Sequence, residues 1–244
     1  MIAFGTRAHS ETRRRQIPVM EDTFHKGEWM ETGEDPRLSP IVFLAEQPPD
    51  YQLIPHFHRQ NQFQLFVHGS GTIGPHRVDP VTIHYAGAYT GYGPLLSGDE
   101  GLKYFTIRAA FDTGLIPVSE ARAKMVRGPK RHDQAAIGAP WDSAQLAGLR
   151  EAQQAWPIEP KDGLGAQHAR LPAGAAMALQ CIAGSCGQFV FVLAGSARVR
   201  GHELGVWESV FVTPEERDVA VEAGEGGAEI VCLHMPVTDA AYIA

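Results

Sequence analysis

Cysteine, long apolar runs and positive charge are scarce in this sequence of 244 residues, and each scarcity argues against a class of protein. The only cysteines are Cys181, Cys186 and Cys232, and no two of them have CxxC spacing. An odd number without that spacing argues against a disulfide framework and favours a reducing compartment. No apolar run reaches the roughly 18 residues that a membrane-spanning helix needs, and the first residues lack a signal-peptide pattern. We therefore expect a cytoplasmic protein that does not contact a membrane.

Positive charge is also scarce. Lys and Arg number 21 against 28 Asp and Glu, which gives a net charge of −7 and a pI near 5.9. This balance argues against nucleic acid as a partner, because such proteins carry basic surfaces. The one basic run, Arg13–Arg15, is typical of a solvated surface arm. Hydrophobic residues make up 44% and charged residues 20%, as in ordinary globular proteins with a sizeable core.

The pattern along the chain predicts an all-β protein with a partly helical connector. Residues 1–37 are polar and weakly periodic, and we interpret them as an N-terminal arm whose Phe24, Trp29 and Met30 could pack on a neighbouring chain. Residues 38–116 hold short β-type runs separated by Gly, Pro, Asp and Ser, which is typical of a sandwich or barrel. The predicted strands there are Ile41–Ala45, Tyr51–His58, Phe63–Val67, Val81–Tyr85 and Tyr104–Phe111.

Residues 117–165 differ and form the predicted connector. The two helical windows are Ser119–Met125 and Ser143–Ala155, with Asp142 or Ser143 as N-cap of the second. The β pattern resumes over residues 166–244. The predicted strands there are Ala175–Ile182, Gln188–Leu193, Trp207–Val212, Val219–Val221 and Glu229–Met235.

An internal repeat links the two β-rich parts. Gln62-Phe63 recurs as Gln188-Phe189, and Gly69-Ser70 recurs as Gly195-Ser196. His76 recurs as His202, and all three matches share an offset of 126 residues without a gap. A fixed offset inside matching β patterns indicates two copies of one β-fold.

The stretch Pro55–Gly71 carries the most distinctive chemistry. Successive side chains on a strand point to opposite faces, so alternate residues share a face. One face of this stretch is rich in imidazole and amide groups and the other is apolar, which suggests a lined cavity inside a barrel. The residues expected on the polar face are His56, His58, Gln62, Gln64, Phe66 and His68, and those expected on the apolar face are Phe63, Leu65 and Val67.

The second copy lacks this chemistry. At the offset of 126, His56 becomes Ile182, His58 becomes Gly184 and Gln64 becomes Val190. Only the N-terminal copy is therefore equipped for a polar site.

These residues resemble the first motif of the cupin superfamily. His56-Phe57-His58, then three residues, Gln62, then six residues and Gly69 reproduce its HxH, acid position and final glycine. Gln62 stands where most members have Glu, and Asp50 stands where the upstream Gly is expected. The segment that corresponds to the second motif, Gly87–Gly101, contains no histidine. The resemblance implies two tandem cupin (jelly-roll β-barrel) domains, 38–116 and 166–244, often dimeric, with the site inside the barrel.

The resemblance also implies a metal site. His56, His58 and Gln62 would hold a divalent ion such as Fe, Mn, Ni or Zn, which suit nitrogen and oxygen ligands. An amide oxygen from Gln62 is a weaker donor than a carboxylate. The alternative is a pair of pocket histidines hydrogen-bonded to Gln62 and Gln64 with no metal.

Five further residues are candidates for binding a small-molecule substrate. Gln64 shares the inward parity and could orient a carbonyl or hydroxyl group, and Arg108 could bind a carboxylate through two hydrogen bonds. Tyr92 lies near the position of the missing histidine, while His68 and Tyr104 complete the set with inward parity on their strands. The sequence identifies no catalytic residue.

Two functions from different classes fit this sequence. The first is a metal-dependent bicupin enzyme acting on a small organic molecule in the N-terminal barrel, with dioxygenase-, isomerase- or lyase-type chemistry. The alternative is a metal-free bicupin that binds or senses a small ligand without catalysis. A metal-free isomerase with His56 or His58 as the base is a third interpretation. In each case we expect a homodimer.

Overall fold

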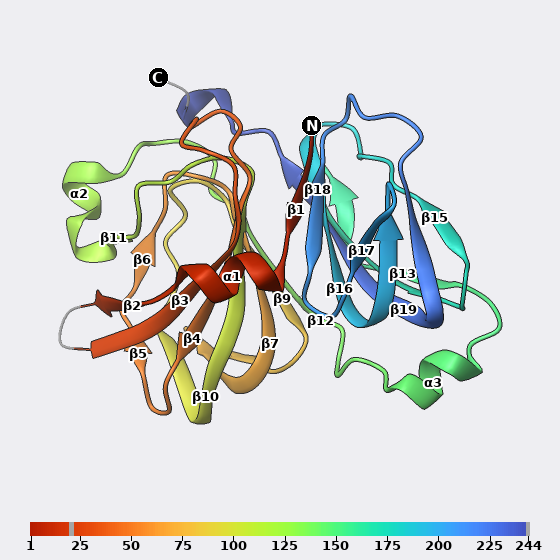
Figure 1. Ribbon diagram of the computed structural model, residues 1–244. Coiled ribbons are helices and arrows are strands. Elements are labelled where there is room, and N and C mark those ends of the chain that lie inside the picture. Colours follow the sequence, from red (N-terminus) through yellow and green to blue (C-terminus); the bar gives the residue numbers. More distant parts are fainter. Residues whose placement is uncertain (20–21, 243–244) are drawn as a thin grey trace. The chain divides into compact units, whose positions relative to one another are not determined.

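The computed structural model describes residues 1–19 and 22–242. The described part of the chain divides into two compact units, each built around its own antiparallel β-sheet (Figure 1). Unit 1 contains residues 1–8 and 139–237, and unit 2 contains residues 9–138 and 238–242. The predicted all-β jelly-roll fold is confirmed, because helices are few and short. None of the helices among the described residues is long and apolar enough to cross a membrane.

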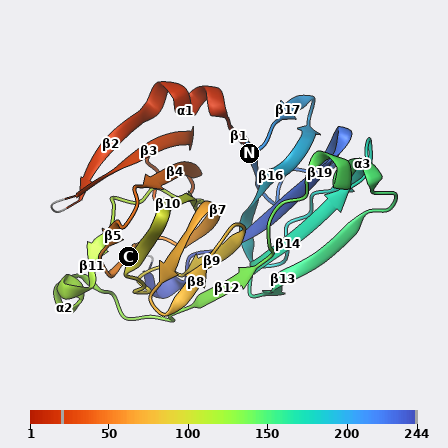
Figure 2. The same cartoon turned by 90° about the horizontal axis from the view of Figure 1, so that it is seen from below.

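Unit 2 is organised by a sheet with the strand order β12-β9-β7-β10-β4-β3-β2. Two short strands extend it, β5 beside β10 and β8 beside β7, and a separate pair joins β6 to β11. Figure 2 shows β4, β10, β7 and β9 as consecutive neighbours. The bounds are β2 (Arg14–Val19), β3 (Asp22–Glu31), β4 (Ile41–Gln47), β5 (Gln52–Leu53), β6 (His56–Phe57), β7 (Gln62–Ile73), β8 (His76–Val78), β9 (Thr82–Ala86), β10 (Leu95–Arg108), β11 (Ile116–Pro117) and β12 (His132–Ala136).

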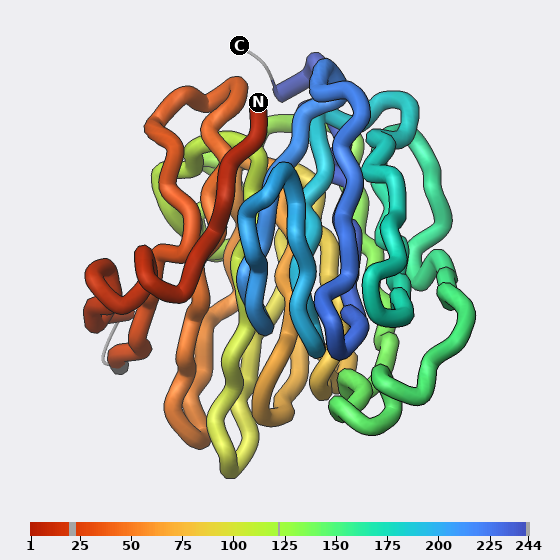
Figure 3. The backbone as a smooth tube through the Cα atoms, turned by 45° about the vertical axis from the view of Figure 1, so that its right-hand side comes forward, coloured from red at the N-terminus to blue at the C-terminus, as the bar shows by residue number. Residues whose placement is uncertain are grey.

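Unit 1 is organised by a sheet with the order β1-β18-β16-β19-β14-β13, with β15 beside β19 and β17 beside β16. The long strands β16 and β19 run side by side, as the blue tubes of Figure 3 show. The bounds are β1 (Ile2–Gly5), β13 (Gln153–Lys161), β14 (Leu164–Leu171), β15 (Ala176–Ala178), β16 (Ser185–Val199), β17 (His202–Leu204), β18 (Ser209–Val212) and β19 (Ala220–Pro236).

The offset found in the sequence also relates the strands of the two units. Strand β8 begins at His76 and β17 begins at His202, and both follow a long strand with which they pair. Gly69 and Gly195 have φ values of +73° and +72°, which favour glycine. At each of them an added Cβ would lie 2.1 Å from a carbonyl oxygen, that of Gly101 or of Gly227. The repeated glycine therefore marks the same close approach of two strands in each unit.

The N-terminal segment contributes strands rather than a free arm. Strand β3 pairs with β4 along most of its length, and β1 pairs with β18 of unit 1. Trp29 and Met30, which we expected to pack on another chain, are buried inside unit 2, where Trp29 contacts Phe105 edge to face at 5.2 Å. Met20 and Glu21 lie outside the described residues. Helix α1 (Arg7–Arg13) connects β1 to β2.

The connector holds helical segments at both predicted windows. Residues 118–124 form η1 (Val118–Glu120) and α2 (Ala121–Lys124), which match the first window to within one residue at each end, whereas the second window is helical only in its first part. Helix α3 (Ser143–Gly148) begins after the predicted cap Asp142, whose side chain accepts from the backbone N–H of Gln145 in a capping box. It ends at Gly148, and only the last three residues of the window, 153–155, pair with β14 as part of β13. The last segment is η2 (Ala240–Tyr242).

Candidate functional site

Unit 2 contains a cavity of about 550 Å³ in the barrel that the sequence singled out. Strands β10 and β7 carry its polar wall, and β2, β3 and β4 contribute most of the apolar wall. Polar or charged groups that line it include His56, His58, Gln64, Thr106, Arg108 and Asp112. Its apolar lining comprises Ile17, Val19, Phe24, Ile41, Phe43, Ala45, Leu53, Phe111 and Leu115.

Neighbouring strands bring polar side chains together on one face. On β10, Tyr104, Thr106 and Arg108 alternate and so share a face. The ladder places Thr106 opposite Gln64 and Tyr104 opposite Phe66 on β7. All of these side chains are buried, which is unusual for polar groups and requires hydrogen-bond partners.

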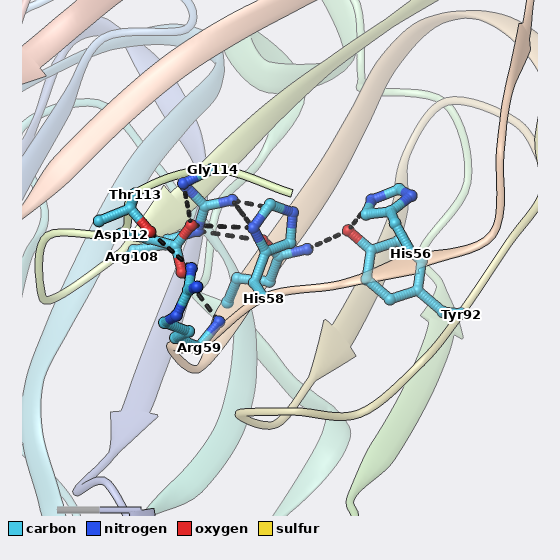
Figure 4. Close-up of polar contacts among 9 residues, drawn as sticks. His56, His58, Arg59, Tyr92, Arg108, Asp112, Thr113 and Gly114 are labelled. Carbon is cyan, nitrogen blue, oxygen red and sulfur yellow. Dashed lines mark hydrogen bonds and ion pairs between the residues drawn. The ribbon is translucent and has the colours of Figure 1, made fainter. Parts of the chain in front are cut away.

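Arg108 lies at the centre of a network of buried hydrogen bonds that includes Gln62 and His58 (Figure 4). Its side chain is 3% exposed, and its Nε and Nη2 groups donate to Gln62 Oε1 at 3.0 and 2.7 Å. Nη2 also lies 3.2 Å from His58 Nε2. The Nη1 group has no partner among the described residues, although Arg108 lines the cavity. A buried guanidinium therefore presents unused N–H groups to the cavity.

His58 connects Arg108 to a carboxylate. His58 Nδ1 donates to Asp112 Oδ1 at 3.0 Å, so its Nε2 accepts from Arg108. Burial and the nearby Arg108 charge lower the pKa of His58 to about 3, and the imidazole is neutral. Asp112 also accepts from the backbone N–H groups of Arg59 and Gly114. Burial alone would raise the pKa of Asp112, but the His58 hydrogen bond and the Arg108 charge hold it well below its usual range.

His56 belongs to a second branch that also leads from Arg108. Gln62 Nε2 donates to the Tyr92 hydroxyl, which donates to His56 Nε2 at 2.8 Å. His56 Nδ1 donates to the carbonyl oxygen of Ile54 at 2.7 Å. Burial lowers the pKa of His56 to about 4 and raises the pKa of Tyr92. The proton positions are therefore consistent in both branches. The histidines are neutral, and each branch begins with an N–H group of Arg108 that donates.

Gln64 is held by a different set of residues. Its Oε1 lies 2.8 Å from Nδ1 of His84, a fully buried residue on β9. His84 Nε2 contacts Nε2 of His132 on the neighbouring strand β12. The Gln64 NH₂ group has no partner among the described residues, and Gln64 lines the cavity. The side chain thus offers donors to the same space as Arg108.

Most of the predicted binding residues meet at this site. Tyr104 and Gln64 line the cavity with Arg108, and Tyr92 lies behind His56. His68 does not join them: it is exposed, and it lies opposite Lys103 beyond an irregularity in the pairing of β7 with β10. This irregularity ends the inward parity on which the His68 prediction depended.

The three predicted metal ligands lie close together, but their donor atoms are already used. His56 and His58 each have both ring nitrogens in hydrogen bonds, and Gln62 Oε1 accepts twice from Arg108. A divalent ion at this point would lie beside a buried guanidinium and be repelled by it. Among the described residues, no three His, Cys, Asp or Glu side chains are grouped to hold a metal ion. As arranged, the residues do not fit a divalent ion.

Asp112, His84 and Thr106 are site residues that the sequence reasoning did not assign. Asp112 lies 54 positions from His58 and follows the end of β10 in a loop, where the pairing with β7 no longer indicates its neighbours. The face of His84 could not be fixed from its strand alone. Thr106 could have been found, because it lies between Tyr104 and Arg108 with the same parity.

The equivalent positions of unit 1 form no such network. Arg108 corresponds to His234 and Gln62 to Gln188, and these two pair across β16 and β19. Both ring nitrogens of His234 and the Nε2 of Gln188 are buried without a hydrogen-bond partner among the described residues. Val190 and its neighbours fill the interior as an apolar cluster.

Comparison with solved structures shows the fold. The manganese(II)-containing oxalate decarboxylase of Bacillus subtilis superimposes with a TM-score of 0.59 at 11% identity, over 95% of this chain and 77% of the decarboxylase. The bacterial pirin YhhW of Escherichia coli, solved with nickel(II), gives 0.56 at 12% identity over 97% and 99%. The salicylate 1,2-dioxygenase of Pseudaminobacter salicylatoxidans gives 0.52 at 14% identity over 80% and 70%.

These neighbours are cupin proteins, and the chain has their all-β jelly-roll fold. No protein-family model matches the sequence. No curated protein matches it either. At such low identities the likeness extends to the fold alone, so the function must be argued from the site.

Proposed function

We propose that the barrel of unit 2 binds a small organic carboxylate without the participation of a metal ion. The observation that carries this proposal is Arg108, a buried cation with an unused Nη1 group at the cavity wall. Guanidinium groups bind carboxylates through charge-assisted hydrogen bonds, which are stronger than neutral ones. A buried charge with free donors favours an anionic ligand over a neutral one.

The neighbours of Arg108 support the same ligand. Gln64 offers an NH₂ group, and Thr106 and Tyr104 offer hydroxyl groups on the same wall. Donors in this arrangement match a group that only accepts hydrogen bonds, as an ionised carboxylate does.

The remaining walls support an apolar body for the ligand. Phe24, Phe43 and Phe111 line the cavity with several aliphatic side chains. Its volume of about 550 Å³ is in the range of cavities that hold small organic molecules. At its edge, Glu28 accepts from Lys26 and Arg15 at 2.7 Å each, which neutralises part of the positive charge there.

A metal-dependent cupin enzyme is the second candidate. It is favoured by the fold neighbours, which include a manganese(II) decarboxylase and a pirin solved with nickel(II). In this chain, His56 and His58 would first have to give up their hydrogen bonds to Tyr92 and Arg108. The two-domain bicupin organisation with boundaries at 37, 116 and 165, the homodimer and the cytoplasmic location stay predictions.

Calorimetric titration of benzoate into chelator-treated protein tests the first proposal. We expect saturable binding that is lost in Arg108→Met, which keeps an apolar side chain of similar length without the charge. Benzamide, the neutral counterpart of benzoate, should bind more weakly. Arg77→Met is the matched control, since Arg77 is exposed and pairs with Asp79 away from the cavity.

The second candidate is tested in a separate preparation that has not been exposed to a chelator. Elemental analysis of protein purified without chelator, and melting curves with added Ni(II) or Mn(II), would reveal a metal site. Stoichiometric metal that is lost in His58→Ala, together with no carboxylate binding, would replace the first proposal with the second.

A further inference from the structure

A chain of two histidines leads from the surface of unit 2 to the cavity. His132 is an exposed residue of the edge strand β12, and its Nε2 contacts Nε2 of His84 on β9. His84 is fully buried, and its Nδ1 lies 2.8 Å from Gln64 Oε1. We call His132 and His84 the histidine pair.

The chemistry of these contacts permits one arrangement of protons. An amide oxygen can only accept, so His84 Nδ1 must carry the proton that it donates to Gln64. His84 is a neutral imidazole, because burial holds its pKa well below the usual range. Its Nε2 is then an acceptor, and His132 Nε2 must donate. Nε2 of His132 carries a proton both in the charged form and in the neutral form that is protonated there. His132 therefore donates to His84 in either charge state.

The order of protons decides which end of the Gln64 amide faces the ligand. With Oε1 held by His84, the NH₂ group is the end left without a partner among the described residues, and Gln64 lines the cavity. If the amide rotated by half a turn, its oxygen would face the ligand beside Arg108. A carboxylate would be repelled by that oxygen, whereas a carboxamide would gain an acceptor for its own N–H groups.

We propose that the histidine pair positions the Gln64 amide and thereby makes the cavity select a carboxylate over the corresponding carboxamide. His84 and His132 are positioning residues that act through Gln64 and do not touch the ligand. This inference rests on the proposed binding function and adds to it the residues that set its specificity.

The test is a double-mutant cycle between His132 and Gln64, with benzoate and benzamide as probes. His132 is exposed, so His132→Ala should fold. We expect His132→Ala to weaken benzoate binding by about 5-fold and to lower the benzoate-to-benzamide affinity ratio. In a Gln64→Ala background the same substitution should change neither affinity. His132→Gln retains an N–H donor at a similar distance from the backbone and should restore most of the ratio.

Gln134→Ala is the matched control. Gln134 is an exposed residue of the same strand, and its side chain donates to the backbone oxygen of Arg77 rather than to the histidine pair. Equal losses from His132→Ala with and without Gln64 would overturn the proposal and assign His132 a structural role. An unchanged affinity ratio in His132→Ala would also overturn it.

A second measurement needs no ligand. In ¹⁵N NMR spectra of the full chain, His84 should be the Nδ1–H form in the wild type and a mixture of tautomers in His132→Ala. A wild-type His84 protonated at Nε2 would overturn the inference even if benzoate binds. Conversely, an Nδ1–H His84 in a protein that binds no carboxylate would refute the proposed function while leaving the histidine pair in place.

Discussion

The two units use related strands to enclose different interiors. In unit 2, Arg108, Gln62 and Gln64 turn into the barrel, where hydrogen bonds to other buried side chains hold them and leave the Arg108 Nη1 and Gln64 NH₂ groups for the cavity. In unit 1, the equivalent positions hold His234, Gln188 and Val190, and an apolar cluster fills the space. The glycine contacts are common to both. The comparison indicates that the fold depends on backbone geometry at a few glycines. The same strand arrangement can enclose either a polar cavity or a packed apolar core.

The largest expected effect tests the shared part of this comparison. Gly69→Ala and Gly195→Ala should each lower the free energy of unfolding of their unit by roughly 2–4 kcal/mol, since each forces a positive φ on alanine and a clash with a carbonyl oxygen. Hydrogen exchange of β7–β10 and of β16–β19 reports each unit separately.

A control separates strain from the clash. Gly201 has a φ of +80°, but its added Cβ would meet nothing within 4 Å. Gly201→Ala should therefore cost only about 1 kcal/mol. A large loss at Gly69 with a small one at Gly195 would break the structural equivalence of the two units.

The next effect should have opposite signs in the two units. Arg108→Leu removes the donor to Gln62 and to His58, so unit 2 should lose about 1–3 kcal/mol of unfolding free energy. His234→Leu removes a ring with two unpartnered buried nitrogens, so unit 1 should gain about 1–2 kcal/mol. Urea unfolding combined with hydrogen exchange measures both. Losses of similar size in the two units would contradict the contrast between Arg108, which is hydrogen-bonded, and His234, whose ring nitrogens have no partner among the described residues.

A smaller effect is the pH dependence that His234 gives to the stability of unit 1. Burial lowers the pKa of His234 to about 4, against about 6.5 in an unfolded chain. The unfolded state therefore binds more protons between these values, and stability falls as the pH falls through this window. Unit 1 should lose roughly 1 kcal/mol between pH 7 and pH 5.5 through this residue. Subtracting the same curve for His234→Leu isolates the contribution, and parallel curves would show that His234 does not titrate as described.

The smallest effect compares two helix starts. Asp142 caps α3 through the capping box, whereas α2 follows Glu120, which makes no side-chain cap. Asp142→Ala should destabilise unit 1 by about 0.5–1 kcal/mol. Glu120→Ala, the control, removes only an exposed ion pair with Lys124 and should leave unit 2 unchanged within about 0.5 kcal/mol. Circular dichroism melting curves suffice for both.

Local spacing allowed much of this molecule to be predicted. The Asp142 cap depends on residues near one another in sequence, and the structure has it as predicted. The repeat relates positions 126 apart, and the same close glycine contact is found at Gly69 and Gly195. The HxH stretch is a strand only in part, because β6 ends before His58. Gln64, Tyr104 and Arg108 were proposed from strand parity and Tyr92 from its place near the missing histidine, and all four lie in one barrel.

What could not be predicted depends on distant pairing. Asp112 reaches His58 only because a loop folds back, and His68 leaves the inward face only because the pairing shifts beside it. The contacts of Arg108 with Gln62 and His58 are a further case, since strand parity predicted only the face of its side chain and arginines are usually exposed. Such partners are properties of the tertiary structure.

The pairing of β1 with β18 has a consequence for how the protein is made. Gly5 lies opposite Ser209, so 204 positions separate them along the chain. A ribosome adding about 5–20 residues per second needs roughly 10–40 s to extend the chain from one to the other. During that time β1 has no strand to join, while every strand of the unit 2 sheet, from β2 to β12, is synthesised. Strand β1 must thus wait for β18, although strands that follow β1 in the chain can pair sooner.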